Sequence, residues 1–334
     1  MTQTTDLLLP GLLHLADSVQ DPRSLAKNSP LLHRVLRFAG VLGCQPASLD
    51  DLLRNCLGQA ADQGLPYAAN ASKGSSDVLF TPVSLRAGIN NATILPVDEN
   101  RENIDILINS LRDYFKVDFT VSVEAYPLYR MHLRQVSPVT GMPHYLAALG
   151  TPLTHYIETA RTQVPWYRLL NEIQMFLHQH PLNQQRMADG RAAINSLWCW
   201  GGDRLPNNFR AEVTVFCDDP EIRALGNVMA QGGFDMRQLA ENQHAGQRVI
   251  VDLSLLRWLK GLDQTPIEQL LARLDELLAR LLETSQGTLN LRTGGESDLE
   301  FKPGSEWRVW RRPRYLDSFS SDQQAEMLLP DQPL

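Results

Sequence analysis

Hydrophobic residues recur along the chain with two different spacings, and segments of the two kinds alternate. Apolar positions three or four residues apart predict helices over 28–40, 49–58, 102–115, 164–180, 220–230 and 265–282. Short apolar runs, or apolar positions two residues apart, predict strands at 7–9, 78–80, 119–123, 129–133, 194–200, 213–216, 249–251, 289–291 and 307–310. Strands that alternate with helices are typical of an α/β fold, with helices around a mostly parallel sheet.

One stretch departs from this alternation. The helix predicted at 102–115 is followed directly by two strands, which together form a compact α+β unit. We therefore predict an α/β core made of 1–95 and 161–316, a small inserted α+β subdomain at 96–160, and a loose polar tail at 317–334.

Composition narrows the class of protein. The chain has 334 residues, of which 43% are hydrophobic, and its formal net charge is −7. These values suit one or two globular domains and exclude a wholly disordered, collagen-like or coiled-coil chain. The acidic balance also argues against a dedicated nucleic-acid binder.

The segment 307–315 is the exception to this acidic balance, because arginines and aromatic residues alternate in it. Such side chains can stack on bases and hold phosphates. The candidate nucleic-acid contacts are Arg308, Trp310, Arg311 and Arg312. The alternative is an edge strand whose arginines face water and oppose aggregation.

Cysteine usage and hydropathy indicate a compartment. Cys44, Cys56, Cys199 and Cys217 form no C-x-x-C pair, which is typical of buried thiols in a reducing environment. The apolar stretch from Leu7 to Leu15 is interrupted by Pro10 and is far shorter than the ~20 residues of a membrane span. We expect a cytoplasmic protein that makes no membrane contact.

The sequence lacks the common catalytic motifs. There is no G-x-S-x-G, Walker A, G-x-G-x-x-G or H-E-x-x-H motif, and the eight histidines are dispersed except for His178 and His180. Asp218 and Asp263 are weak candidates for metal ligands, although an Asp before Pro220 is equally a helix N-cap. The sequence predicts no catalytic residue, no resident metal and no cofactor.

The run from Asn171 to Pro206, NEIQMFLHQHPLNQQRMADGRAAINSLWCWGGDRLP, carries the most distinctive pattern. It resembles the bacterial family of RpfE-type regulatory proteins, described as cofactor-independent phosphoglycerate mutase-like. A more distant resemblance links Asn195 to Pro206 with the N-x-x-W-x-W-G-x-G-x-x-P stretch of archaeal-type phosphoglycerate mutases. This resemblance implies an alkaline-phosphatase-like core with an inserted domain.

The catalytic positions of those mutases do not carry over. Their Asp-Gly after the first strand is Pro10-Gly11 here, and their ligand loop before the long helix retains at most Asp263. Their Asp-His pair after the last strand is replaced around Arg292 to Gly295. A dinuclear site without most of its ligands loses its metals. The resemblance therefore implies a degenerate, non-catalytic member of the mutase type, a pseudoenzyme.

We expect a regulatory or scaffolding protein that acts through protein–protein contacts. The candidate interaction surface is Glu172, Gln174, His178, His180, Asn183, Arg186, Asn195, Trp198, Trp200 and Arg204. The alternative is that these residues only buttress a strand turn through buried hydrogen bonds. The partner is an unknown protein, and the family resemblance weakly suggests a DNA-repair exonuclease. Two further alternatives are a metal-dependent phosphatase or phosphoglycerate mutase, and a single-stranded nucleic-acid or repair-complex accessory protein.

Overall fold

A computed structural model describes residues 4–15, 29–60, 63–68, 76–88, 91–204, 210–239, 241, 246–284 and 287–305. The chain divides into two compact units, the first made of 1–58 and 210–334 and the second of 59–209. Within the described residues, no helix is long and apolar enough to cross a membrane.

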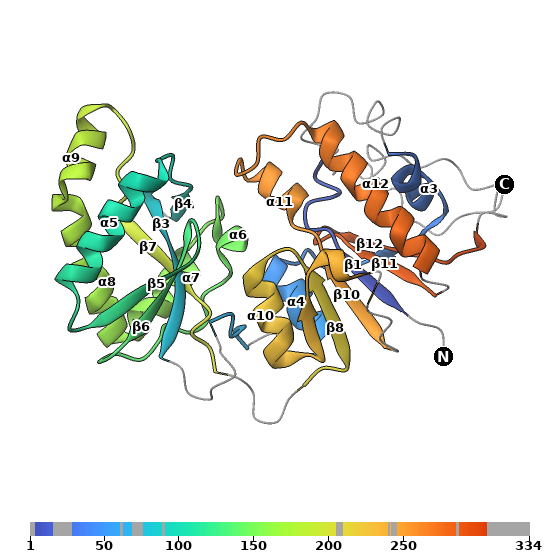
Figure 1. The fold of residues 1–334 in the computed structure, drawn as a ribbon, viewed down its shortest axis with the longest axis horizontal. Helices are drawn as coiled ribbons and strands as arrows, with labels where there is room; N and C mark the ends of the chain where they lie inside the picture. Colours follow the sequence, from blue (N-terminus) through green and yellow to red (C-terminus); the bar gives the residue numbers. More distant parts are fainter. Residues whose placement is uncertain are drawn as a thin grey trace. The chain divides into compact units, whose positions relative to one another are not determined.

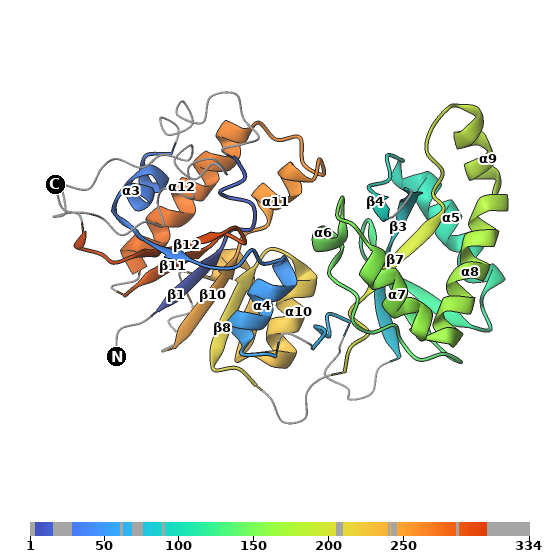
Figure 2. The same ribbon diagram turned by 180° about the vertical axis from the view of Figure 1, so that it is seen from behind.

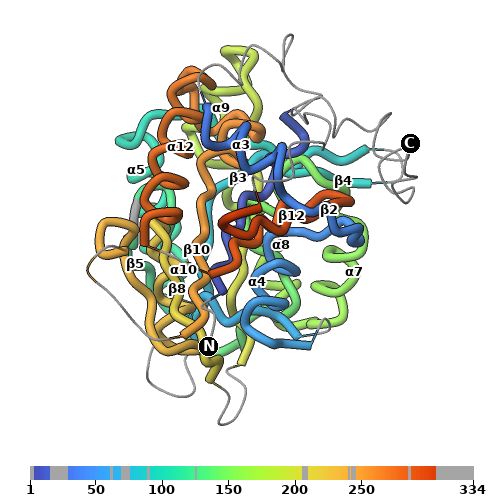
Figure 3. Tube along the Cα trace, turned by 90° about the vertical axis from the view of Figure 1, so that its right-hand side faces the viewer, coloured from blue at the N-terminus to red at the C-terminus, as the bar shows by residue number. Residues whose placement is uncertain are grey.

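The first unit is built on a seven-stranded sheet with the order β2-β12-β11-β1-β10-β8-β9. Strands β11, β1, β10, β8 and β9 run parallel, and β12 pairs antiparallel with both β11 and the edge strand β2. Its strands are β1 (Thr5–Leu8), β2 (Gly40–Gly43), β8 (Val213–Cys217), β9 (Gly232–Phe234), β10 (Gln247–Val251), β11 (Leu289–Arg292) and β12 (Ser297–Phe301). Figure 3 shows β2 and β12 side by side, although they come from opposite ends of the chain.

Helices cover both faces of this sheet (Figures 1 and 2). They are α3 (Pro30–Phe38), α4 (Leu49–Leu57), α10 (Pro220–Met229), α11 (Ser254–Leu259) and α12 (Ile267–Thr284), with a 3₁₀ turn at Met236–Leu239. The leucines of α12 join Leu7, Ile250 and Leu291 in one buried apolar cluster. On α10, Gly226 packs so closely on Val215 that a Cβ there would lie 2.9 Å from it, so α10 covers the opposite face.

The second unit has an antiparallel sheet. Its strands are β3 (Asp77–Ala87), β4 (Ala92–Leu95), β5 (Phe119–Ala125), β6 (Leu128–Leu133) and β7 (Ser196–Trp200). Strand β3 pairs with β6 and β4 along one edge and with β7 along the other, and β5 pairs with β6. The helices are α5 (Arg101–Tyr114), α6 (Tyr145–Ala148), α7 (Thr154–Thr162), α8 (Val164–Gln179) and α9 (Pro181–Ala188). The Tyr129 hydroxyl bonds to Asp105 of α5, so α5 covers the sheet face that carries the Phe80–Tyr129 stack.

The predicted fold class, helices around a mostly parallel sheet, is confirmed. The boundaries of the inserted part differ from the predicted 96–160, because the second unit spans 59–209. The strands predicted at 78–80 and 194–200 pair with each other as β3 and β7 and belong to this unit rather than to the core sheet. Hydrophobic spacing identifies a strand but not the sheet that it joins. The tail predicted at 317–334 lies outside the described residues.

Candidate functional site

The carboxyl edge of the parallel sheet is the first of two candidate sites. Ligands of open α/β sheets bind at this edge. Here the strand ends lead into Pro10, Asp218 and Asp219, Asp235, Asp252, and Thr293. The edge is therefore acidic on the side of β8, β9 and β10.

Most of these carboxylates have a partner within the chain. Asp219 stands at the N-cap position of α10 without capping it; instead, its Oδ2 lies 2.5 Å from Nη2 of Arg257. Asp252 accepts hydrogen bonds from the backbone N–H and the hydroxyl of Ser254. Asp235 accepts from the N–H of Arg237, 2.9 Å away, and Arg223 approaches its other oxygen.

The two candidate metal ligands differ in environment. Partial burial and the nearby charge of Asp235 raise the pKa of the Asp218 carboxyl above its ordinary value. Hydrogen bonds from Thr265 lower the pKa of Asp263, whose Oδ1 accepts from the Thr265 N–H at 2.8 Å. Among the residues that the structure describes, no group of three or more His, Cys, Asp or Glu side chains is placed to hold a metal ion.

The second region is the segment 171–204 of the sequence motif. Two of its asparagines, Asn183 and Asn195, bind backbone groups. Asn183 is fully buried, and its amide donates to the carbonyls of Leu177 and Ile194 while accepting from the N–H of Ile194. Asn195 exchanges two hydrogen bonds with the backbone of Leu85, at 2.6 and 2.9 Å. Each side-chain amide therefore forms the pair of backbone hydrogen bonds that a neighbouring strand would otherwise form.

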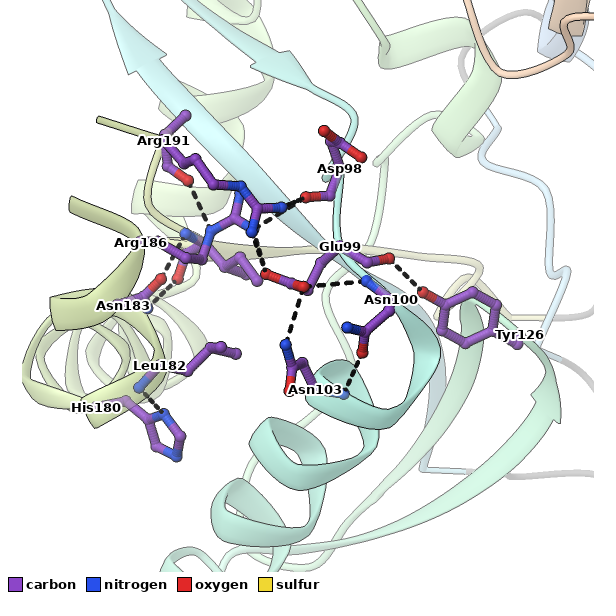
Figure 4. Close-up of polar contacts among 12 residues, drawn as sticks. Asp98, Glu99, Asn100, Asn103, Tyr126, His180, Leu182, Asn183, Arg186 and Arg191 are labelled. Carbon is purple, nitrogen blue, oxygen red and sulfur yellow. Dashed lines mark hydrogen bonds and ion pairs between the residues drawn. The ribbon is translucent and has the colours of Figure 1, made fainter. Parts of the chain in front are cut away.

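Arg186 forms the charged centre of the segment (Figure 4). Its Nη1 lies 2.5 Å from Oε2 of Glu99, and the two side chains are only 5% and 3% exposed. Its Nε donates to the carbonyl of Ala192, and Arg191 adds a second cation 3.2 Å from the same Glu99 oxygen. The other Glu99 oxygen accepts from Asn100 and Asn103 at the start of α5.

The balance of these contacts sets the ionisation of Glu99. Burial alone raises the pKa of a carboxyl group, but hydrogen bonds from Asn103, Arg186 and Asn100 and the charge of Arg191 outweigh it. The pKa of Glu99 is accordingly lower than its ordinary value. The sequence motif did not identify Glu99, because it lies far upstream; the available signal was its place just before the N-cap Asn100 of a predicted helix.

The two tryptophans are core residues. Trp198 donates its indole N–H to the carbonyl of Pro143 at 3.1 Å, and Trp200 packs its ring against His144 and Tyr145. The chain then turns at Gly201, where φ is +76° and a Cβ would lie 2.7 Å from the backbone nitrogen of Ala68. Only glycine fits both the left-handed conformation and the close approach.

The remaining predicted surface residues point outward to different degrees. Glu172, His178 and Arg204 are exposed. Gln174 is half-buried and donates to the Ser196 hydroxyl at 3.1 Å. Half-buried His180 caps α9 by accepting from the N–H of Leu182, and burial lowers its pKa. Arg308, Trp310, Arg311 and Arg312 lie outside the described residues.

Comparison with solved structures finds proteins of similar fold. The chain is similar to the PH0037 protein from Pyrococcus horikoshii, with a TM-score of 0.51 and 13% identity over 94% of this chain and 90% of that one. It is also similar to the cofactor-independent phosphoglycerate mutase from Thermoplasma acidophilum DSM 1728, with a TM-score of 0.42 and 16% identity over 96% and 95% of the two chains. At these identities the likeness concerns the fold. No protein-family model and no curated protein sequence matches the chain.

Proposed function

We propose that this chain is a non-catalytic, regulatory or scaffolding protein of the phosphoglycerate mutase-like type that acts through protein–protein contacts. The observation that carries the proposal is the carboxyl edge of the parallel sheet. The loop after β1 begins with Pro10 and Gly11, and Asp219 is neutralised by Arg257. A carboxylate held in an intramolecular ion pair is a poor ligand for a catalytic cation, because binding the cation requires breaking that pair.

The outer surface of α8 supports the second part of the proposal. Glu172 and His178 are exposed there, together with Met175, whose side chain is 65% exposed. Exposed methionine is enriched at protein–protein interfaces. Folding of α8 does not require these three side chains, because its buried stripe consists of Trp166, Leu169, Ile173 and Leu177.

Binding to a purified partner tests the surface. On the family resemblance, a single-strand-specific exonuclease is the partner to test first, by biolayer interferometry with the full chain. Glu172→Ala and His178→Ala are expected to weaken binding at least about tenfold, as loss of about 1.4 kcal/mol at an interface does. Glu158→Ala, an exposed change on α7, is the matched control. Unchanged binding by both α8 variants would refute this surface.

A metal-dependent phosphatase or mutase is the competing function, and the raised pKa of Asp218 favours it, because perturbed carboxyls cluster at active sites. The decisive measurement is metal content together with turnover of 3-phosphoglycerate and p-nitrophenyl phosphate in Mn²⁺ and Zn²⁺. The proposal predicts no turnover above that of a heat-denatured sample. Turnover that disappears in Asp218→Asn or Asp263→Asn would overturn it.

A further inference from the structure

A histidine–aspartate pair joins two neighbouring strands of the second unit's sheet. His132 of β6 is directly opposite Asp77 of β3, and its Nδ1 is 2.6 Å from Asp77 Oδ1. The Asp77 side chain is 8% exposed, whereas that of His132 is 57% exposed. The carboxylate is therefore held inside the fold while the imidazole faces solvent.

This arrangement fixes which nitrogen of the imidazole is reactive. An ionised carboxylate only accepts hydrogen bonds, so Nδ1 carries the proton of the pair in neutral His132. The lone pair then resides on Nε2, which has no hydrogen-bond partner among the described residues. A carboxylate on Nδ1–H also fixes the orientation of the ring. Nε2 of His132 is thus an oriented and accessible nucleophile.

The neighbours of His132 provide donors rather than apolar contacts. Exposed Thr120 lies opposite His132 on β5, and exposed Ser122 lies opposite Arg130. Arg130, two residues before His132 on the same face, uses Nε for Glu124 and Nη1 for the Ala68 carbonyl and Asp77. Its Nη2 has no hydrogen bond or ion pair with any described residue. A guanidinium and two hydroxyls beside a nucleophile suit the oxygens of a phosphoryl group.

We propose that Nε2 of His132 is a phosphoryl-acceptor site, oriented by Asp77. With phosphoramidate as donor, the Nε2 lone pair attacks phosphorus, the P–N bond of the donor breaks, and ammonia leaves. Nδ1 keeps its proton, and the Asp77 carboxylate balances the positive charge that the ring acquires. This site belongs to the second unit and does not depend on the proposed non-catalytic role of the sheet edge in the first.

The test is a comparison of histidines within one folded chain. The full-length protein is incubated with phosphoramidate at pH 8, and the phosphohistidine at each position is followed by peptide mass spectrometry and ³¹P NMR. His178 is the internal control, because it is exposed and has no carboxylate partner among the described residues. We expect His132 to be labelled about 10-fold faster than His178, the lower end of the effect that a carboxylate partner has on metal-binding histidines.

The Asp77→Asn variant tests whether the labelling rate of His132 depends on the Asp77 carboxylate or only on the exposure of the imidazole. It should slow labelling of His132 about 10-fold and leave His178 unchanged, and an unchanged circular dichroism spectrum and melting temperature show that the variant is folded. Equal labelling of His132 and His178 in the parent protein would overturn the proposal. An Asp77→Asn variant labelled at His132 as fast as the parent would overturn it as well.

Discussion

Asn183 and Ile194 are joined by two hydrogen bonds of 2.8 Å, one to the N–H of Ile194 and one to its carbonyl. The pair ties the first turn of α9 to the residues that enter β7. Because Asn183 is fully buried, solvent does not reach the backbone groups that its amide binds. This contact explains why a polar residue of the sequence motif occupies a fully buried position.

Replacing Asn183 with alanine tests that contact. The change leaves the buried N–H and carbonyl of Ile194 without a partner and removes one of the two donors to the Leu177 carbonyl, which keeps the N–H of His180, so the free energy of unfolding should fall by about 2–4 kcal/mol. Urea unfolding followed by tryptophan fluorescence measures the loss. Gln184→Ala, an exposed change on the same helix, should alter the stability by less than about 0.5 kcal/mol. Equal losses for the two variants would contradict the role given to Asn183.

The ion pair of Glu99 with Arg186 predicts a pH-dependent effect. Glu99→Gln leaves Arg186 buried without its counter-charge and should cost about 3 kcal/mol near pH 7. Because the pKa of folded Glu99 lies below the ordinary value of 4.5, its contribution is complete above that value and is lost as pH falls through the lowered pKa. The difference between parent and variant should therefore shrink below pH 4.5. A difference that stays constant from pH 7 to pH 3 would refute this explanation.

Gly201 and Gly190 allow the cost of a positive φ to be separated from the cost of a steric clash. Both have positive φ, +76° and +74°, so alanine costs about 1–2 kcal/mol at either position for conformation alone. Only at Gly201 would the Cβ also meet backbone, since nothing lies within 4 Å of Gly190. Gly201→Ala should thus be clearly more destabilising than Gly190→Ala in thermal unfolding. Similar melting temperatures would show that the backbone at 67–68 moves to accommodate the Cβ and that the close approach costs little.

Asp218 predicts a stabilising substitution. Its folded pKa is raised by partial burial and by Asp235, so ionisation of Asp218 opposes folding at neutral pH and has no effect below about pH 3.8. Asp218→Asn should raise the thermal unfolding midpoint of the first unit at pH 7, and the increase should vanish as pH approaches 3.8. Since the residue is exposed, the increase is small. A lower midpoint at pH 7 would mean that the backbone hydrogen bond from Met236 to Asp218 outweighs the cost of burial and of the Asp235 charge.

Hydrophobic spacing located the six helices predicted from it but missed α6, α7, α9 and α11, and it did not assign strands to sheets. The leucine pattern of 265–282 matches α12, and α3, α4 and α10 lie where the spacing placed them. The motif residues could not be divided into buried and exposed by pattern alone. Asn183 and Arg186 are polar yet buried because other parts of the chain supply their hydrogen-bond partners. Ile194 follows Asn183 in the next segment, and Glu99 lies far upstream of Arg186. Such pairings depend on tertiary contacts that local spacing does not encode.

The place of β1 in its sheet has a consequence for folding during synthesis. Thr5 pairs with Arg248 on one side and Leu289 on the other, so the central strand leaves the ribosome long before either neighbour exists. The segment 59–209, by contrast, contains all the strands of its own sheet. Domains fold as units as they emerge, and distant pairings form late. The middle of this chain should thus be folded while its first residues still wait for their partners.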